Sequence, residues 1–470
     1  MTSQSVTALA PSPTLSARRL ILPLALAQFI CSFAGSNMNV MINDISRDLD
    51  TTVKGVQTAI TLFLLIMAIL MIPCSKLTDR WGRKRCFNGG LALYGVGALL
   101  SAAAPGLGVL ILGNSVFEGV GTALLIPPVY ILATLWFTDV TRRAWAFGVI
   151  SGLGGIGAAA GPLIGGLITT GISWRAAFVF QAAVVVIIIL LGRRITDPLP
   201  PDPTRPFDAV GAILAGAGMF CLVFGILQAG TNNGLMTVFL VIGVVLLAGF
   251  YVYVRALERR GKEPLLSTSL FKNRTCNLAL VTQNIQWLIL MGTSFVVSVY
   301  LQTVREYSAI KTGVIFTAAT VGLLLSSLAA ERFAKRRPQR TLIVWGFVVS
   351  LAGIGLLIGL VVSWSSIVAF VPGLFLVGFG LGAMLTPSVN VVQSSFPEER
   401  QGEISGLSRS VSNLGSSFGT AVAGTILVAA TSRGNGAYAW AMAAVALAGI
   451  FGLTAALLLP RRAEAQPTTS

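Results

Sequence analysis

The sequence predicts an all-α polytopic membrane protein. Its 470 residues have a mean hydropathy of +0.82, and 11% of them are charged. Soluble domains carry about a quarter charged residues, so this chain has about half the usual content. Apolar runs long enough to cross a bilayer core of about 30 Å recur from Leu20 to the end of the chain. We therefore expect fourteen transmembrane helices with no soluble domain between them.

Charged and proline-containing segments separate the predicted spans. These are residues 20–42, 54–73, 87–104, 107–134, 144–170, 174–192, 209–230, 235–254, 277–301, 312–330, 341–363, 366–391, 404–430 and 437–460. The linker at 193–208 is rich in proline, which blocks a continuous helix. The linker at 255–276 interleaves apolar and charged residues, so an interfacial amphipathic helix and an irregular segment are both open.

Grouping the spans gives five parts. They are a cytoplasmic N-terminal tail at 1–19, a six-helix bundle at 20–192, two additional helices with their linkers at 193–276, a second six-helix bundle at 277–460, and a cytoplasmic tail at 461–470. The loops after spans two and ten support a repeat, because aligning Arg80 with Arg336 places Leu77 opposite Phe333. Repeated halves around a midplane site are a common way to build an alternating-access transporter.

Positive charge is concentrated on one side of the predicted membrane. With the N-terminus inside, 26 of the 33 lysines and arginines fall in cytoplasmic segments and six in outer ones. The positive-inside rule therefore places both termini in the cytoplasm. The net charge of +16 reports this topology, with membrane phospholipids as partners through their anionic headgroups and no role for nucleic acid.

Groups that would indicate an enzyme are scarce. The chain has no histidine, and its five cysteines are scattered without a CxxC pair, which predicts neither a metal site nor a disulfide framework. The sequence also has no P-loop and no nucleophile constellation. We expect a protein that is not an enzyme, is not driven by ATP and needs no cofactor.

Two motifs resemble those of a known family. Residues 75–84, SKLTDRWGRK, resemble the signature loop of the major facilitator superfamily, and residues 157–166, GAAAGPLIGG, resemble the antiporter motif of its exporters. The fourteen spans, EPLLSTSLF before span nine and YLQTVREYSAIKTG after it are similar to the fourteen-spanner drug:proton antiporter branch. The resemblance covers nearly the whole chain. It implies the major facilitator fold, in which two six-helix bundles rock about a central cavity, here with two extra helices.

The resemblance assigns roles to both motifs. In the family, the matching acid and basic residues form a cytoplasmic latch, here Asp79, Arg80, Gly82, Arg83 and Lys84. We expect Asp79 near a helix N-terminus, where the macrodipole favours an acid, and Gly82 in a tight turn. A plain positively charged anchor is the alternative.

The antiporter motif consists of Gly157, Gly161, Pro162, Gly165 and Gly166. Its glycines at steps of four lie on one helical face and let another backbone approach closely. The resemblance implies a seal or pivot facing the outer side, while an ordinary packing seam is the alternative.

Glu118 is the one acid placed deep in a predicted span. Burying a carboxylate in a membrane is costly, so we interpret Glu118 as a candidate proton carrier, against a neutral structural acid as the alternative. Span four departs from that of proton-coupled members of the family. Those members carry an arginine and a glutamine where this chain has Ser115 and Glu118. Ala34 stands where relatives usually place an aspartate in span one.

Polar side chains at helical spacing predict the wall of a substrate cavity, with interhelical hydrogen bonds as the alternative. The candidates are Gln28, Ser32, Ser36, Asn39, Ser115, Gln283, Asn284, Gln286, Trp287, Asn390, Gln393 and Arg409. Asn43 continues the same face of span one. Arg409 either snorkels to the cytoplasmic interface or meets an anionic headgroup or Glu118.

These observations predict a secondary active exporter of lipophilic or cationic small molecules in a bacterial cytoplasmic membrane, coupled to protons. A transporter of lipids or lipid-like metabolites, with altered or absent proton coupling, is the alternative. A monomer is favoured, and the sequence leaves the oligomeric state open.

Overall fold

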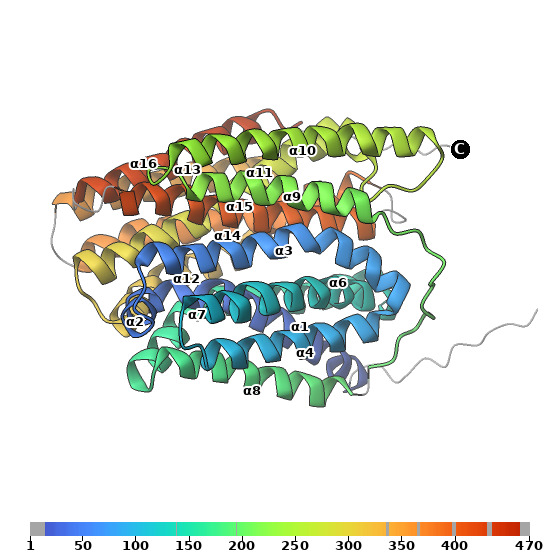
Figure 1. The fold of residues 1–470 in the computed structure, drawn as a ribbon, viewed down its shortest axis with the longest axis horizontal. Helices are drawn as coiled ribbons and strands as arrows, with labels where there is room; N and C mark the ends of the chain where they lie inside the picture. Colours follow the sequence, from blue (N-terminus) through green and yellow to red (C-terminus); the bar gives the residue numbers. More distant parts are fainter. Residues whose placement is uncertain are drawn as a thin grey trace, which may run out of the picture.

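The computed structural model describes residues 15–137, 139–193, 195–334, 338–363, 367–396, 401–429 and 435–460. The tail predicted at 461–470 and most of the one at 1–19 lie outside these ranges. All regular structure within them is helical (Figure 1). In the first half, the helices are α1 (Leu15–Asn37), η1 (Met38–Met41), α2 (Ile42–Asp48), α3 (Val53–Trp81), α4 (Arg83–Ala102), α5 (Leu107–Leu110), η2 (Ile111–Glu118), α6 (Gly119–Trp136), α7 (Val140–Gly171) and α8 (Trp174–Gly192).

The second half continues in the same way after two further helices, α9 (Ala209–Leu227) and α10 (Asn233–Arg259). It comprises η3 (Thr268–Lys272), α11 (Arg274–Val299), η4 (Tyr300–Val304), α12 (Ala309–Ala334), α13 (Gln339–Ser363), η5 (Ile367–Ala369), α14 (Phe370–Ser394), α15 (Gln401–Ala429) and α16 (Asn435–Leu457). Several of these helices begin at a polar cap whose side chain accepts a hydrogen bond from a nearby backbone amide, namely Asp139, Ser173, Asp208, Asn232 and Asn273.

Within the described ranges, twelve helical segments are long and apolar enough to cross a membrane. Two of the fourteen predicted spans, those in α4 and α15, fall outside this set although the helices have 20 and 29 residues. Helix α4 begins with three basic residues, and α15 is rich in serine, so both are less hydropathic than their neighbours. The order of the long helices is the predicted one, and the count of fourteen crossings stays a prediction.

The helices pack in two matched sets. In the first set, α1 packs on α7, α4 on α6 and α8, and α3 on α6. In the second, α11 packs on α15, α13 on α14 and α16, and α12 on α14. Contacts between the sets are matched as well, because α3 packs on α15 and α12 packs on α7. The pair α9 and α10 adds to one edge, where α9 contacts α3 and α15 (Figure 1).

Glycines allow close packing at equivalent positions in the two sets of helices. A Cβ added at Gly90 or Gly97 of α4 would meet the backbone of the α6 segment within 3 Å. The same holds for Gly346 and Gly353 of α13 against α14. Both pairs are related by the offset that aligns Arg80 with Arg336, so the repeat extends from the loops into the helix packing.

Two predicted loops have a different structure. Residues 75–81 belong to α3, and only Gly82 separates α3 from α4, because no glycine or proline occurs after Pro73 to end the helix sooner. The linker at 255–276 does not form an amphipathic helix. Helix α10 runs on to Arg259, and the rest holds only the short 3₁₀ helix η3.

Candidate functional site

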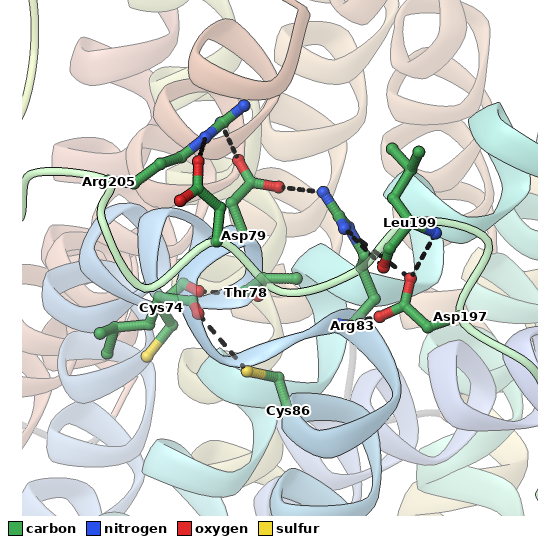
Figure 2. A network of polar contacts seen from close by, with 10 residues as sticks. Cys74, Thr78, Asp79, Arg83, Cys86, Asp197, Leu199 and Arg205 are labelled. Atoms are coloured by element: carbon green, nitrogen blue, oxygen red, sulfur yellow. Dashed lines mark hydrogen bonds and ion pairs between the residues drawn. The ribbon is translucent and has the colours of Figure 1, made fainter.

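A polar network surrounds the turn between α3 and α4 (Figure 2). Arg83 Nη2 donates a hydrogen bond to Asp79 Oδ1 at 2.7 Å, and Arg205 Nη1 donates to Asp79 Oδ2 at 2.9 Å. Asp197 Oδ2 accepts from the Arg83 backbone amide at 2.6 Å, and Asp197 Oδ1 lies 3.7 Å from Arg83 Nη1. The Arg83 side chain is only 7% exposed. Two carboxylates therefore balance a nearly buried guanidinium.

The prediction that Asp79 lies near a helix N-terminus is wrong. Asp79 lies in the last turn of α3, where the macrodipole disfavours an acid, so its charge is stabilised by the two arginines instead. Gly82 has a φ of +95°, a conformation that suits glycine, and forms the expected tight turn. Lys84 donates to the Arg193 carbonyl at 3.4 Å, whereas Arg80 makes no hydrogen bond or ion pair with another described residue.

The linker at 193–208 holds this network from outside. It crosses the end of the first bundle from α8 to α9 (Figure 1). The Asp202 amide donates to the Asp79 carbonyl oxygen at 3.1 Å, beside the ion pair of Arg205. Hydrogen bonds from the Thr204 hydroxyl and amide lower the pKa of the Asp202 carboxyl. The linker is thus ordered onto the motif by charge-assisted contacts, which the sequence reasoning missed.

The glycines of α7 pack against two helices. Gly157 and Gly161 lie against Phe29, Phe33 and Ser36 of α1. Gly166 lies against the backbone of α12, where an added Cβ would be 2.5 Å from the Ala309 oxygen. The motif therefore forms a close seam within the first set of helices and also reaches across to the second.

Further contacts join the two sets near the predicted outer face. Asn43 Nδ2 donates to the Gln302 carbonyl oxygen at 2.5 Å, and the Asn43 amide donates to Gln302 Oε1 at 3.1 Å. Gln302 Nε2 donates to the Asn39 carbonyl at 2.8 Å. The Ile310 amide donates to Thr170 Oγ1 at 3.1 Å, linking α12 to α7. The ends of the two sets that are predicted to face outward are held together by these hydrogen bonds.

The expected polar face of span one is interrupted. Gln28, Ser32 and Ser36 lie on α1, but Asn39 falls in the 3₁₀ turn η1 and Asn43 in α2, so the α-helical spacing does not carry through. Ser36 donates to the Phe33 carbonyl of its own helix at 3.2 Å.

A second cluster joins α1, α6 and α15. Gln28 Nε2 donates to Ser32 at 3.1 Å, and the Tyr130 hydroxyl donates to Gln28 Oε1 at 3.2 Å. The Arg409 guanidinium donates to the Tyr130 hydroxyl and lies over its ring, 4.8 Å from the centroid. Tyr130 also stacks on Phe147 at 5.7 Å. Of the open alternatives for Arg409, the pairing with Glu118 does not form, because the guanidinium contacts the hydroxyl and ring of Tyr130 instead.

Glu118 is fully buried at the junction of η2 and α6. Its Oε2 accepts from Asn114 Nδ2 at 3.3 Å, and Oε1 has no hydrogen-bond partner among the described residues. Helix η2, which ends at Glu118, packs against α4 and α3. The side chain thus faces the interior of the first bundle and not the lipid.

Other candidates bridge neighbouring helices. Ser115 donates to the Ala59 carbonyl of α3 at 2.8 Å, and Asn284 donates to the Val411 carbonyl of α15 at 2.9 Å. Gln283 and Gln286 each accept from a serine, Ser408 and Ser388, at 2.9 Å.

The remaining candidates are Trp287, which is half-buried, Gln393, which is half-buried, and Asn390, which is exposed. These contacts fit the interhelical alternative for several positions. The cavity wall stays a prediction for the whole set.

The chain has detectable relatives along nearly its full length. The model of a family described as Major Facilitator Superfamily matches residues 24–420 and 285–470. The puromycin resistance protein pur8 of Streptomyces alboniger is 30% identical over 440 residues, which cover 92% of this chain and 86% of the relative. The tetracenomycin C resistance and export protein of Streptomyces glaucescens is 30% identical, covering 82% and 71%.

Other matches extend the similarity. The multidrug resistance protein Stp of Mycobacterium tuberculosis is 26% identical over 392 residues, covering 83% of this chain and 72% of the relative. A crystal structure of the peptide transporter POT with sulfate has a TM-score of 0.69 at 16% identity, covering 94% of this chain and 95% of that one. At that identity the likeness shows the fold alone.

Proposed function

The chain belongs to the Major Facilitator Superfamily and is a multi-pass membrane transporter rather than an enzyme; from this premise we propose that it exports lipophilic or cationic small molecules by alternating access. The observation that carries the proposal is the similarity, over most of both chains, to relatives named for resistance to puromycin and for export of tetracenomycin C. A lipid transporter is not favoured, because these relatives are named for drugs and antibiotics.

The contacts between the two helix sets support alternating access. The predicted outer ends are joined through Asn43, Gln302 and the α7–α12 seam, while Arg409 of α15 contacts Tyr130 of α6 toward the other end. The contacts of Asn43 with Gln302 and of Arg409 with Tyr130 are polar, so water can replace them when they break. Exchange between states with a closed outer side and a closed cytoplasmic side would expose a central site to each side in turn.

We assign proton coupling to Glu118. It is a fully buried acid, and one of its oxygens has no hydrogen-bond partner in the part of the chain that the structure describes, which fits a group that gains and loses a proton as its surroundings change. The side chain lies in the first bundle, so its effect on substrate would pass through the packing of α6 against α1 and α4. We also propose that the transporter lies in the bacterial cytoplasmic membrane with both termini in the cytoplasm, which the distribution of lysine and arginine supports.

Purified protein in liposomes with an imposed pH gradient tests this function. We expect gradient-driven movement of a fluorescent cationic dye, inhibited by puromycin as a competing substrate. Glu118→Gln should lose the dependence on the gradient, whereas Glu263→Gln, the same change at an exposed acid in the linker before η3, should keep it. Movement of a labelled phospholipid without movement of dye or drug would overturn the proposal in favour of lipid transport.

A further inference from the structure

Helix α10 is the least covered of the long helices in the described part of the chain. Among its 27 residues only Gly243 and Val254 are buried, and it packs on α9 and η3. Figure 1 shows it at one edge of the molecule, beyond α9. Its remaining surface faces the bilayer, so its composition reports what it contacts there.

One face of α10 changes from apolar to positively charged along the helix. Val238, Val241, Val245 and Val252 recur at steps of three, four and seven, and all four are exposed, with Val245 at 63% and Val252 at 66%. Residues so spaced lie in one stripe of a helix. The next positions on that stripe, Arg255 and Arg259, are exposed guanidiniums. An apolar stripe thus ends in two positive charges at the predicted cytoplasmic boundary.

The two guanidiniums have no carboxylate partner among the described residues. Like charges four residues apart on a helix repel each other. Two nearby acids are used elsewhere, because Glu258 accepts from Ser267 and Thr268 of η3 and Asp208 accepts from Tyr253 and the Leu265 amide. Glu263, four residues after Arg259, forms no ion pair with either arginine. The arrangement leaves positive charge uncompensated on the lipid-facing side.

The same turns form an open pocket of 410 Å³. It is lined by Tyr251, Val252, Arg255, Ala256, Arg259 and Arg260. A tyrosine and a valine at one end and arginines at the other match a ligand with an anionic head and a hydrocarbon tail. Clusters of basic residues at the cytoplasmic end of a transmembrane helix attract anionic lipid headgroups by the same chemistry.

We propose that α10 carries a specific site for an anionic phospholipid of the cytoplasmic leaflet, whose phosphate contacts Arg255 and Arg259 and whose acyl chain lies along the valine stripe. The bound lipid supplies the negative charge that the helix lacks. This site is separate from the transported substrate and does not depend on the proposed function.

Native mass spectrometry of the purified protein, titrated with phosphatidylglycerol or phosphatidylcholine, tests the proposal. We expect phosphatidylglycerol to bind more tightly, and Arg255→Gln with Arg259→Gln to weaken it by roughly 30-fold, about fivefold for each charge. Arg85→Gln with Arg142→Gln, which removes two exposed charges elsewhere, should leave it unchanged. Arg255→Lys with Arg259→Lys should restore most binding, showing that the loss is not misfolding.

Three results would overturn the proposal. One is equal loss of phosphatidylglycerol in the two glutamine pairs, which would make the effect one of net charge. Another is equal binding of phosphatidylcholine, which would make the contact apolar and unspecific. The third is displacement of the lipid by millimolar inorganic phosphate alone, because the stripe would then contribute nothing.

Discussion

Replacing Asp79 with asparagine removes the negative charge at the centre of the network around the α3–α4 turn. Asp79 is 25% exposed and accepts from Arg83, which is nearly buried, at 2.7 Å. A hydrogen bond between charged groups contributes about 1.5–3 kcal/mol when desolvated, and asparagine retains part of it. The second partner, Arg205, is 57% exposed, so that ion pair adds at most about 1 kcal/mol. We expect a loss of about 1–2 kcal/mol, or roughly 5- to 30-fold in the population of the closed network.

The thiol of Cys86 offers a direct readout of this loss. It is buried beneath the network and lies 3.8 Å from the Leu77 carbonyl that accepts from it (Figure 2). In a background with the other four cysteines replaced by serine, Asp79→Asn should speed maleimide labelling of Cys86 by the same 5- to 30-fold. Transport by reconstituted protein should fall while membrane insertion stays normal.

A matched control is Glu263→Gln, which removes an exposed acid on the same side of the molecule. It should change neither labelling nor transport. A variant with asparagine at position 79 that transports at the normal rate and labels Cys86 no faster would refute the latch reasoning.

Three further changes test other contacts. Gly157→Ala should lower the midpoint of thermal unfolding in detergent, because the added Cβ would press on the Phe29 carbonyl and overpacking costs about 1–3 kcal/mol. Gly152→Ala meets only open space and should leave the midpoint unchanged. Equal midpoints for the two variants would contradict close packing of α7 on α1 at Gly157. Glu118→Gln should change the free energy of unfolding by no more than about 1 kcal/mol while abolishing proton uptake during transport. Proton uptake at the normal rate would exclude Glu118 as the proton carrier. Asn43→Ala should remove one hydrogen bond at the outer face, costing about 0.5–1.5 kcal/mol, and speed labelling of a cysteine placed at Ser36 from outside; unchanged labelling would mean that this contact does not hold the outer side closed.

Apolar length and charge position are local properties, so the sequence could predict them. The order of helices, the repeat and Gly82 as the turn after residue 81 follow from runs of residues and from backbone sterics. The exact ends of the helices were harder to predict from the sequence. Charged residues 75–81 were expected in a loop, but a helix can continue beyond the bilayer wherever no residue breaks its hydrogen bonds.

The partners of polar side chains were less predictable. Tyr130 was missed because one aromatic residue in an apolar span gives no pattern, and its role arises only where α6 meets α15. Arg205 and Asp197 were missed because they are more than a hundred residues from Asp79 and Arg83 in the chain. For their proline-rich linker the sequence predicted only that no continuous helix forms.

The amino-acid order alone determined that this chain crosses a membrane many times and that its halves repeat, and it predicts which side the basic residues occupy. Those outcomes depend on transfer of side chains between water and lipid, which each segment undergoes by itself. Which polar groups pair was decided by tertiary packing, because a hydrogen bond acts over about 3 Å and joins whichever side chains the helices bring together. Asp79 shows the difference, because the sequence gives its charge but does not give its position at the end of α3 between two arginines.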